Sequence, residues 1–159
     1  MDSKHFVKDK NNLLSHNLWS GGELLNNSTG FSNNTANQVI ISSDYSTNGV
    51  KSFKLTKTKN GVEYFYFHWL TPYTETGSTL ILTWDTKVVN NAYYAMALRA
   101  MNENARDLSR QSISITQTSI NNQLSITIPE NNSYISCFIT MQGDENSIIY
   151  LDNLHLNSQ

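Results

Sequence analysis

The side chains that could carry acid–base or metal chemistry are few in this chain, which has four histidines and 13 acidic residues among its 159. No two histidines are one helical turn apart, the spacing that places two metal ligands on one helix face. The sequence also has no nucleophile elbow, no phosphate-binding loop and no pair of cysteines. We therefore expect that the protein is not an enzyme.

A second group of side chains is suited to reversible binding of a polar ligand. Arg99 lies within the apolar run 92–101, where a charged side chain must reach either solvent or a specific partner. If this run is a strand, Tyr93 and Arg99 share the side opposite its apolar residues. An aromatic ring can cover the C–H face of a sugar, while guanidinium and amide groups bond its hydroxyls. The predicted ligand contacts from runs 92–101 and 133–142 are Tyr93, Arg99, Tyr134 and Gln142.

Other aromatic residues extend this prediction or belong to the core. Alternation in run 62–70 separates two sets, and we assign the first, Phe65, Phe67 and Trp69, to the core together with Trp84. The second set joins the ligand contacts if its strand lies in the same sheet, and it consists of Tyr64, Tyr66 and His68. Three aromatic residues lie in expected loops. Trp19 is either a core residue or a ligand contact, and Tyr45 and Tyr73 are each either a ligand contact or a loop anchor.

One carboxylate lies within the apolar run that ends the chain. Asp152 is preceded by Leu151 and followed two residues later by Leu154. Burying a carboxylate is costly unless it is hydrogen-bonded, paired or bound to a cation. Backbone N–H groups, a lysine or a metal ion would each satisfy it, and the sequence leaves these alternatives open.

The elements that must position these residues are predicted to be β-strands. From about residue 38 onwards, short apolar runs alternate with turn signals such as Asn48-Gly49 and Asn60-Gly61, and no window shows a 3.6-residue period. We expect residues 1–37 to be irregular and 102–109 to form a loop. The predicted strands are Gln38–Ser42, Val50–Thr58, Val62–Leu70, Thr79–Val88, Ala92–Met101, Gln111–Gln117, Gln123–Ile128, Ser133–Gln142 and Ser147–Leu156. The pattern predicts an all-β, antiparallel two-sheet sandwich.

Composition restricts the partners. Charged residues make up 15% of the chain and the formal net charge is −2, with no basic stripe to neutralise phosphates, so we expect no nucleic-acid partner. No apolar stretch approaches the ~20 residues of a membrane helix, and the first residues do not resemble a signal peptide. The chain is therefore either cytosolic or part of a larger secreted protein. Its single cysteine, Cys137, lies in an apolar run and is expected to be buried.

The order of several features resembles a known family. These features are Asn12-Leu13-Leu14, Trp19, the run Asn48–Leu55 and the final run Ile149–Leu156. Together they resemble the jelly-roll carbohydrate-binding modules of the family 4, 9 and 22 type, which share the galactose-binding-like fold. The resemblance implies a non-catalytic module that binds a polysaccharide or other glycan, is tethered to other domains of a larger protein, and acts outside the cell or at its surface.

The resemblance also leaves an alternative, since similar jelly rolls occur in phage tail and surface proteins. There the domain would have a structural or adhesive role and no sugar ligand. In either case we expect one domain at residues 12–157, preceded by an extension at 1–11. By resemblance, the position of Asp152 binds a structural calcium ion, to which Asn48 and the main chain near Lys51 would contribute oxygen ligands.

Overall fold

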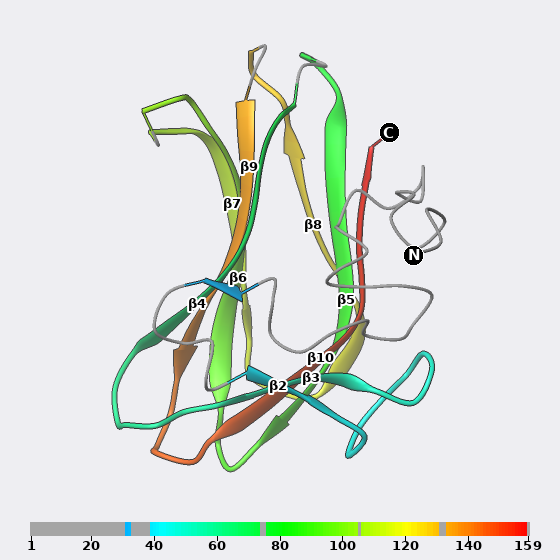
Figure 1. The fold of residues 1–159 in the computed structure, drawn as a ribbon, viewed down its shortest axis with the longest axis vertical. Coiled ribbons are helices and arrows are strands. Elements are labelled where there is room, and N and C mark those ends of the chain that lie inside the picture. The colour runs from blue at the N-terminus through cyan, green and yellow to red at the C-terminus, as the bar shows by residue number, and fades with distance from the viewer. Residues whose placement is uncertain (1–30, 33–38, 74–75, 105, 131–132, 159) are drawn as a thin grey trace, which may run out of the picture.

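The computed structural model describes residues 31–32, 39–73, 76–104, 106–130 and 133–158, with the main chain alone for 31–32 and 66–73. Two five-stranded antiparallel sheets face each other across the core (Figure 1). The prediction of an all-β, antiparallel two-sheet sandwich is confirmed. The regular structure of the described residues is all strand, so they include no helix that could cross a membrane.

The strand order places the C-terminal strands at the centre of both sheets. The first sheet, in spatial order, contains β1 (Phe31–Ser32), β4 (Glu63–Tyr73), β9 (Ser133–Gln142), β6 (Tyr93–Met101) and β7 (Asp107–Ile115). The second sheet, in the same sense, contains β2 (Val39–Ser42), β3 (Ser52–Thr56), β10 (Ile148–Ser158), β5 (Thr79–Val89) and β8 (Ser119–Thr127).

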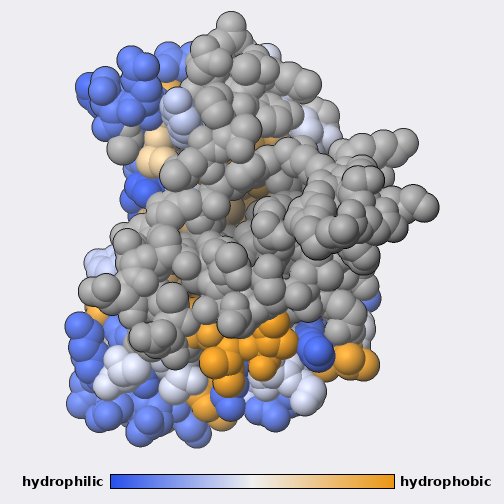
Figure 2. Space-filling view, in the orientation of Figure 1, coloured by the Kyte–Doolittle hydropathy of each residue, from blue (hydrophilic) through white to orange (hydrophobic). Residues whose placement is uncertain are grey.

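Two segments that were expected to be irregular contain strands. The first is β1, which lies within 1–37 and pairs with β4. The second is the start of β7, which begins at Asp107, inside the expected loop 102–109. β7 is a polar strand at the edge of the first sheet, and Figure 2 shows hydrophilic residues along this side of the molecule. None of the first residues of β7 is buried, so this segment lacks the alternation that marks a half-buried strand.

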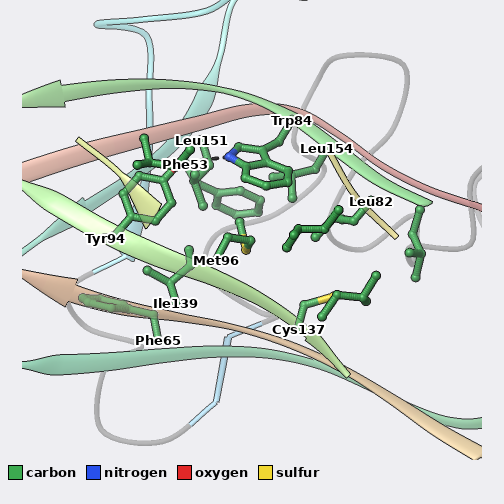
Figure 3. Close-up of a cluster of buried hydrophobic side chains, with 14 of the residues drawn as sticks. Phe53, Phe65, Leu82, Trp84, Tyr94, Met96, Cys137, Ile139, Leu151 and Leu154 are labelled. Carbon is green, nitrogen blue, oxygen red and sulfur yellow. Dashed lines mark hydrogen bonds between the residues drawn. The ribbon is translucent and has the colours of Figure 1, made fainter. Parts of the chain in front are cut away.

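Alternation along the strands builds the core, as predicted. Trp84 of β5 and Tyr94 of β6 come from opposite sheets, and the Trp84 indole N–H donates to the Tyr94 hydroxyl at 3.0 Å (Figure 3). Phe65 is fully buried with them, whereas the side chains of Phe67 and Trp69 lie outside the described residues. Cys137, on the middle strand β9, is buried as expected, and burial raises the pKa of its thiol to about 12.

Candidate ligand-binding face

Strand pairing brings the predicted ligand contacts onto one side of the first sheet. Every second side chain of β6 and β9 points into the core. The side chains between them point away from the second sheet, and we call the surface that they form the outer face. On it, Tyr93 lies opposite Gln142 and Arg99 opposite Ser136. β4 adjoins β9 on the other side and places Tyr64 opposite Thr140.

The placement of the predicted contacts differs from residue to residue. Those whose side chains the structure describes on the strands of the outer face are Tyr64, Tyr93, Arg99, Tyr134 and Gln142. Those whose side chains lie outside the described residues are Trp19, Tyr66, His68 and Tyr73. Tyr45 is elsewhere, because its ring packs 5.7 Å from that of Tyr150 on the second sheet.

Two exposed tyrosines stand at one end of the outer face. Tyr64 is 49% exposed and Tyr93 is 42% exposed, so both rings are accessible to a ligand. The Tyr93 hydroxyl donates to Oε1 of Gln142 at 3.0 Å, which fixes the ring beside the amide. Both groups line an open pocket of about 330 Å³, whose remaining lining residues are Gly61, Asn91, Gly143 and Asp144. Its size is within the range of small-ligand sites.

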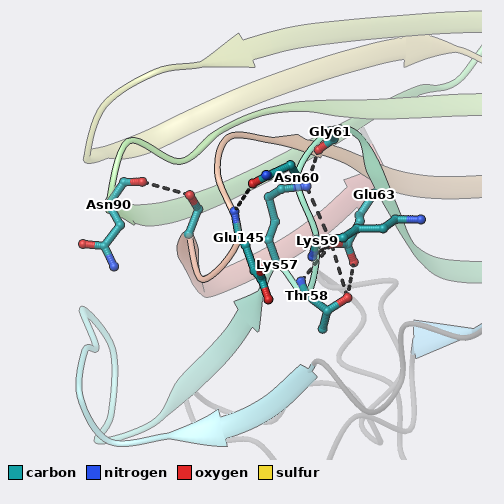
Figure 4. A network of polar contacts seen from close by, with 9 residues as sticks. Lys57, Thr58, Lys59, Asn60, Gly61, Glu63, Asn90 and Glu145 are labelled. Atoms are coloured by element: carbon teal, nitrogen blue, oxygen red, sulfur yellow. Dashed lines mark hydrogen bonds and ion pairs between the residues drawn. The ribbon is translucent and has the colours of Figure 1, made fainter.

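The pocket walls are loops whose backbone has positive φ angles, which favour glycine and asparagine. Gly61 and Gly143 have φ angles of +90° and +118°, a region that side chains with a Cβ rarely adopt. Asn91 follows Asn90 in a tight turn in which both residues have positive φ. Two of these loops are joined directly, since the Glu145 main-chain N–H donates to Oδ1 of Asn60 at 2.9 Å (Figure 4).

A buried ion pair supports the Gly61 wall. The Lys57 ammonium is fully buried, lies 3.6 Å from Oε1 of Glu63 and donates to the main-chain carbonyl of Gly61 (Figure 4). Glu63 in turn accepts hydrogen bonds from the main-chain N–H groups of Thr58 and Lys59 at 2.8 and 3.1 Å. This network fixes the turn between β3 and β4, and with it one side of the pocket.

The other part of the outer face carries a cluster of two arginines, an aspartate and a phenylalanine, which we call the arginine cluster. The guanidinium carbons of Arg99 and Arg110 each lie 5.0 Å from the centroid of the Phe138 ring, a cation–π arrangement. Asp107 lies 3.4 Å from Arg99 and 3.7 Å from Arg110. Phe138 is only 6% exposed although it is outside the hydrophobic core cluster.

A pair of buried carboxylates lies on the second sheet. Asp152 of β10 is directly opposite Asp85 of β5, and both are buried. Oδ2 of Asp152 accepts hydrogen bonds from the main-chain N–H groups of Thr47 and Asn48, and the Thr47 hydroxyl lies within hydrogen-bond distance of both carboxylates. Oδ1 of Asp152 is buried without a hydrogen-bond partner in the described part of the chain.

Of the alternatives that the sequence left open for Asp152, these contacts show the backbone N–H groups, which bond Oδ2. Oδ1 has no such partner among the described residues. Asn48 donates its main-chain N–H to Oδ2 of Asp152 at 3.0 Å, and the Lys51 side chain is exposed. The described residues hold no group of three or more His, Cys, Asp or Glu side chains suited to a metal.

The two carboxylates still fit a hard cation. Two buried negative charges face each other, and no ion pair to either of them occurs among the described residues. Oxygen ligands from carboxylate, hydroxyl and amide groups are those that calcium prefers. The Asn153 side chain lies beside the pair, where its Nδ2 donates to Oδ2 of Asp85 at 3.4 Å and its Oδ1 accepts from Nδ2 of Asn48, so it would offer that oxygen to a cation only after it rotates.

Sequence reasoning missed several of these residues. Arg110 and Asp107 were overlooked because β7 begins four residues earlier than expected, at Asp107. Strand pairing then places Arg110 opposite Arg99. Asp85 follows the core residue Trp84 and was not singled out. Only strand pairing reveals that it faces Asp152, and no sequence spacing encodes that register.

Comparisons with known proteins match the fold. No protein-family model and no curated protein sequence matches the chain. A family 16 carbohydrate-binding module matches with 17% identity and a TM-score of 0.58, over 88% of this chain and 99% of that one. The family 22 CBM22-1 xylan-binding domain of Paenibacillus barcinonensis Xyn10C matches with 12% identity and a TM-score of 0.53, over 84% of each chain.

A phage protein matches as well. The enzymatically active domain of bacteriophage CBA120 tailspike protein 4 matches with 15% identity and a TM-score of 0.67, over 93% of this chain. This chain spans about a fifth, 21%, of the tailspike chain. At these identities the similarity concerns the fold. The chain therefore has the jelly-roll β-sandwich fold of carbohydrate-binding modules, as the resemblance in its sequence predicted.

Proposed function

We propose that this chain is a non-catalytic carbohydrate-binding module that binds a glycan on the outer face of its first sheet. The observation that carries the proposal is the exposed Tyr93, hydrogen-bonded to Gln142 at the edge of an open pocket. The full-length similarity to a carbohydrate-binding module and to a xylan-binding domain supports it. Tyr64 and Tyr134 lie on the same sheet and extend the proposed surface.

The chemistry of this face suits sugars. A tyrosine ring that stacks on a pyranose buries apolar area worth ~25 cal/mol per Å², and the Gln142 amide and the pocket main chain can bond hydroxyls. Along β6, Tyr93 and Arg99 are six residues apart, which corresponds to about 20 Å. A ligand that contacts both is an oligosaccharide or a polymer chain. We expect affinities in the micromolar to millimolar range, about −8 to −4 kcal/mol.

The acidic groups near the pocket support a binding role without catalysis. Glycoside hydrolysis requires two carboxyl groups that flank the scissile bond. The residues that line the pocket include one acid, Asp144, which is exposed. In our proposal the module is tethered to other domains of a larger protein and acts outside the cell or at its surface.

We also propose that a structural calcium ion is held by Asp85 and Asp152. The unpartnered, buried Oδ1 of Asp152 supports this, and the hydroxyl of Thr47 and the side chains of Asn48 and Asn153 lie around the pair. The ion would supply positive charge that offsets the two buried carboxylates. Its effect would be on stability, since the pair lies on the second sheet, away from the outer face of the first.

A structural role in a surface or phage tail protein is the second candidate function. The similarity to a tailspike protein over 93% of this chain favours it. Under this function the outer face packs against a neighbouring domain and binds no sugar. Binding assays with the isolated chain separate the two candidates.

Binding can be tested with the full chain against an array of neutral and acidic polysaccharides, followed by calorimetry on those retained. We expect Tyr93→Ala to weaken binding at least about tenfold and Gln142→Ala to weaken it several-fold, because each removes a direct contact. Tyr93→Phe, which keeps the ring, should retain most of the affinity.

The matched control is Ile120→Ala, which truncates an exposed side chain on the second sheet and should leave the affinity unchanged. Full affinity in both Tyr93→Ala and Gln142→Ala would place the site elsewhere. Failure to bind any polysaccharide on the array would rule out the module and favour the structural role.

A further inference from the structure

The arginine cluster brings two like charges together on the outer face. Arg99 of β6 lies directly opposite Arg110 of β7, and like charges in this arrangement destabilise a pair of strands. The side chains do not diverge, because both guanidinium groups converge on the ring of Phe138. The ring attracts each cation, but the repulsion between the two remains. An anion bound beside both groups would relieve it.

The described residues supply only part of that negative charge. Asp107 is the one carboxylate that they place in ion-pair range of either guanidinium, at 3.4 and 3.7 Å. These distances exceed the 2.7–2.9 Å of a strong charge-assisted hydrogen bond. One carboxylate between two guanidinium groups leaves a net charge of +1, and the Arg110 side chain is 48% exposed, so the charge is accessible.

One donor of the cluster has no partner at all among the described residues. Nε of Arg99 is buried and makes no hydrogen bond, although guanidinium groups carry five donors arranged to match planar anions. A buried donor left unpaired is costly, and an acceptor that reached it after a small shift of the side chain would remove that cost. Exposed Ser112 and Ser114 continue the polar surface along β7 next to Arg110.

We infer that the arginine cluster recognises a negatively charged group on the bound glycan, the carboxylate of a uronic acid or a sulfate ester. This inference rests on the proposed function and specifies its ligand class. The planar fork of a guanidinium binds either group through paired hydrogen bonds. Arg99 lies about 20 Å from Tyr93 along β6. The charged sugar unit is therefore several sugar units along the glycan from the unit bound at the pocket. The ligand is therefore an acidic polysaccharide that crosses the outer face.

The test uses the full chain and matched pairs of polymers that differ only in charge. The pairs are polygalacturonate with its methyl ester, and a sulfated galactan with its desulfated form. We expect one charged polymer to bind about 10- to 100-fold more tightly than its neutral counterpart. Which pair shows the difference identifies carboxylate or sulfate as the recognised group. Arg110→Gln should abolish most of the difference between the charged and the neutral polymer.

The control is Arg106→Gln, which removes the same charge from an exposed position in the adjacent loop. If Arg106→Gln weakens binding as much as Arg110→Gln does, the preference is a general charge effect and the inference is wrong. Equal affinity for charged and neutral polymers would also overturn it while the proposed function stands. If no polymer of either kind binds, both fail.

Discussion

At the scale of single residues, Gly143 shows how backbone chemistry shapes the pocket. Its φ of +118° is strained for any residue with a side chain. A Cβ placed there would also meet Oγ of Ser147 at 3.0 Å and the carbonyl oxygen of Asn91 at 3.1 Å. Gly77 has a similar positive φ, +86°, but its Cβ position is open. The two glycines therefore separate conformational strain from steric crowding.

We predict that Gly77→Ala lowers the free energy of unfolding by about 1–2 kcal/mol, the cost of the left-handed conformation alone. Gly143→Ala should lose a further 1–3 kcal/mol or so, because crowding against rigid main chain adds to that cost. Urea denaturation of the two variants measures the difference directly. Equal losses in both would show that the loops around the pocket yield easily.

At the scale of elements, the carboxylate pair ties a loop to two strands. Asp152 of β10 and Asp85 of β5 are opposite each other, and the loop after β2 reaches them through Thr47 and Asn48. Tyr45, in the same loop, has its pKa raised by burial and by the negative charges of the two aspartates. The loop thus lies in the field of two carboxylates that form no ion pair among the described residues, and a bound cation would stabilise all three elements together.

We predict that removing calcium with a chelator lowers the melting temperature. If 1 mM calcium is about 100-fold above its Kd, binding contributes about 2.7 kcal/mol, which corresponds to a shift of about 5–10 °C for a chain of this size. Differential scanning calorimetry with and without chelator measures the shift. Asp152→Asn should abolish it, whereas Asp144→Asn, at an exposed acid, should retain it. An unchanged melting temperature on chelation would argue against the ion.

At the scale of the whole molecule, the sequence predicted the fold well and the site only in part. Alternation located nine of the ten strands of the described residues, all except β1. It also predicted which side chains of β6 and β9 face the core, because burial on one side of a strand leaves a period of two. It could not reveal which strands are neighbours. The pair Arg99 with Arg110 depends on the turn that joins β6 to β7, and the pair Asp85 with Asp152 depends on the register of strands distant in sequence.

The reactivity of the single cysteine, Cys137, can report how often the first sheet opens. Cys137 is buried on the middle strand of the sheet that carries the outer face, and burial raises the pKa of its thiol to about 12, so the thiol is almost wholly protonated at pH 8. A thiol-specific dye should therefore react only in molecules whose first sheet has separated, and its slow kinetics give the frequency of that event. A glycan held across the outer face should slow the reaction by the same factor by which it stabilises the sheet, without any engineered label. Rapid modification in the native state, at the rate seen in urea, would mean that β9 is not sealed between its neighbours.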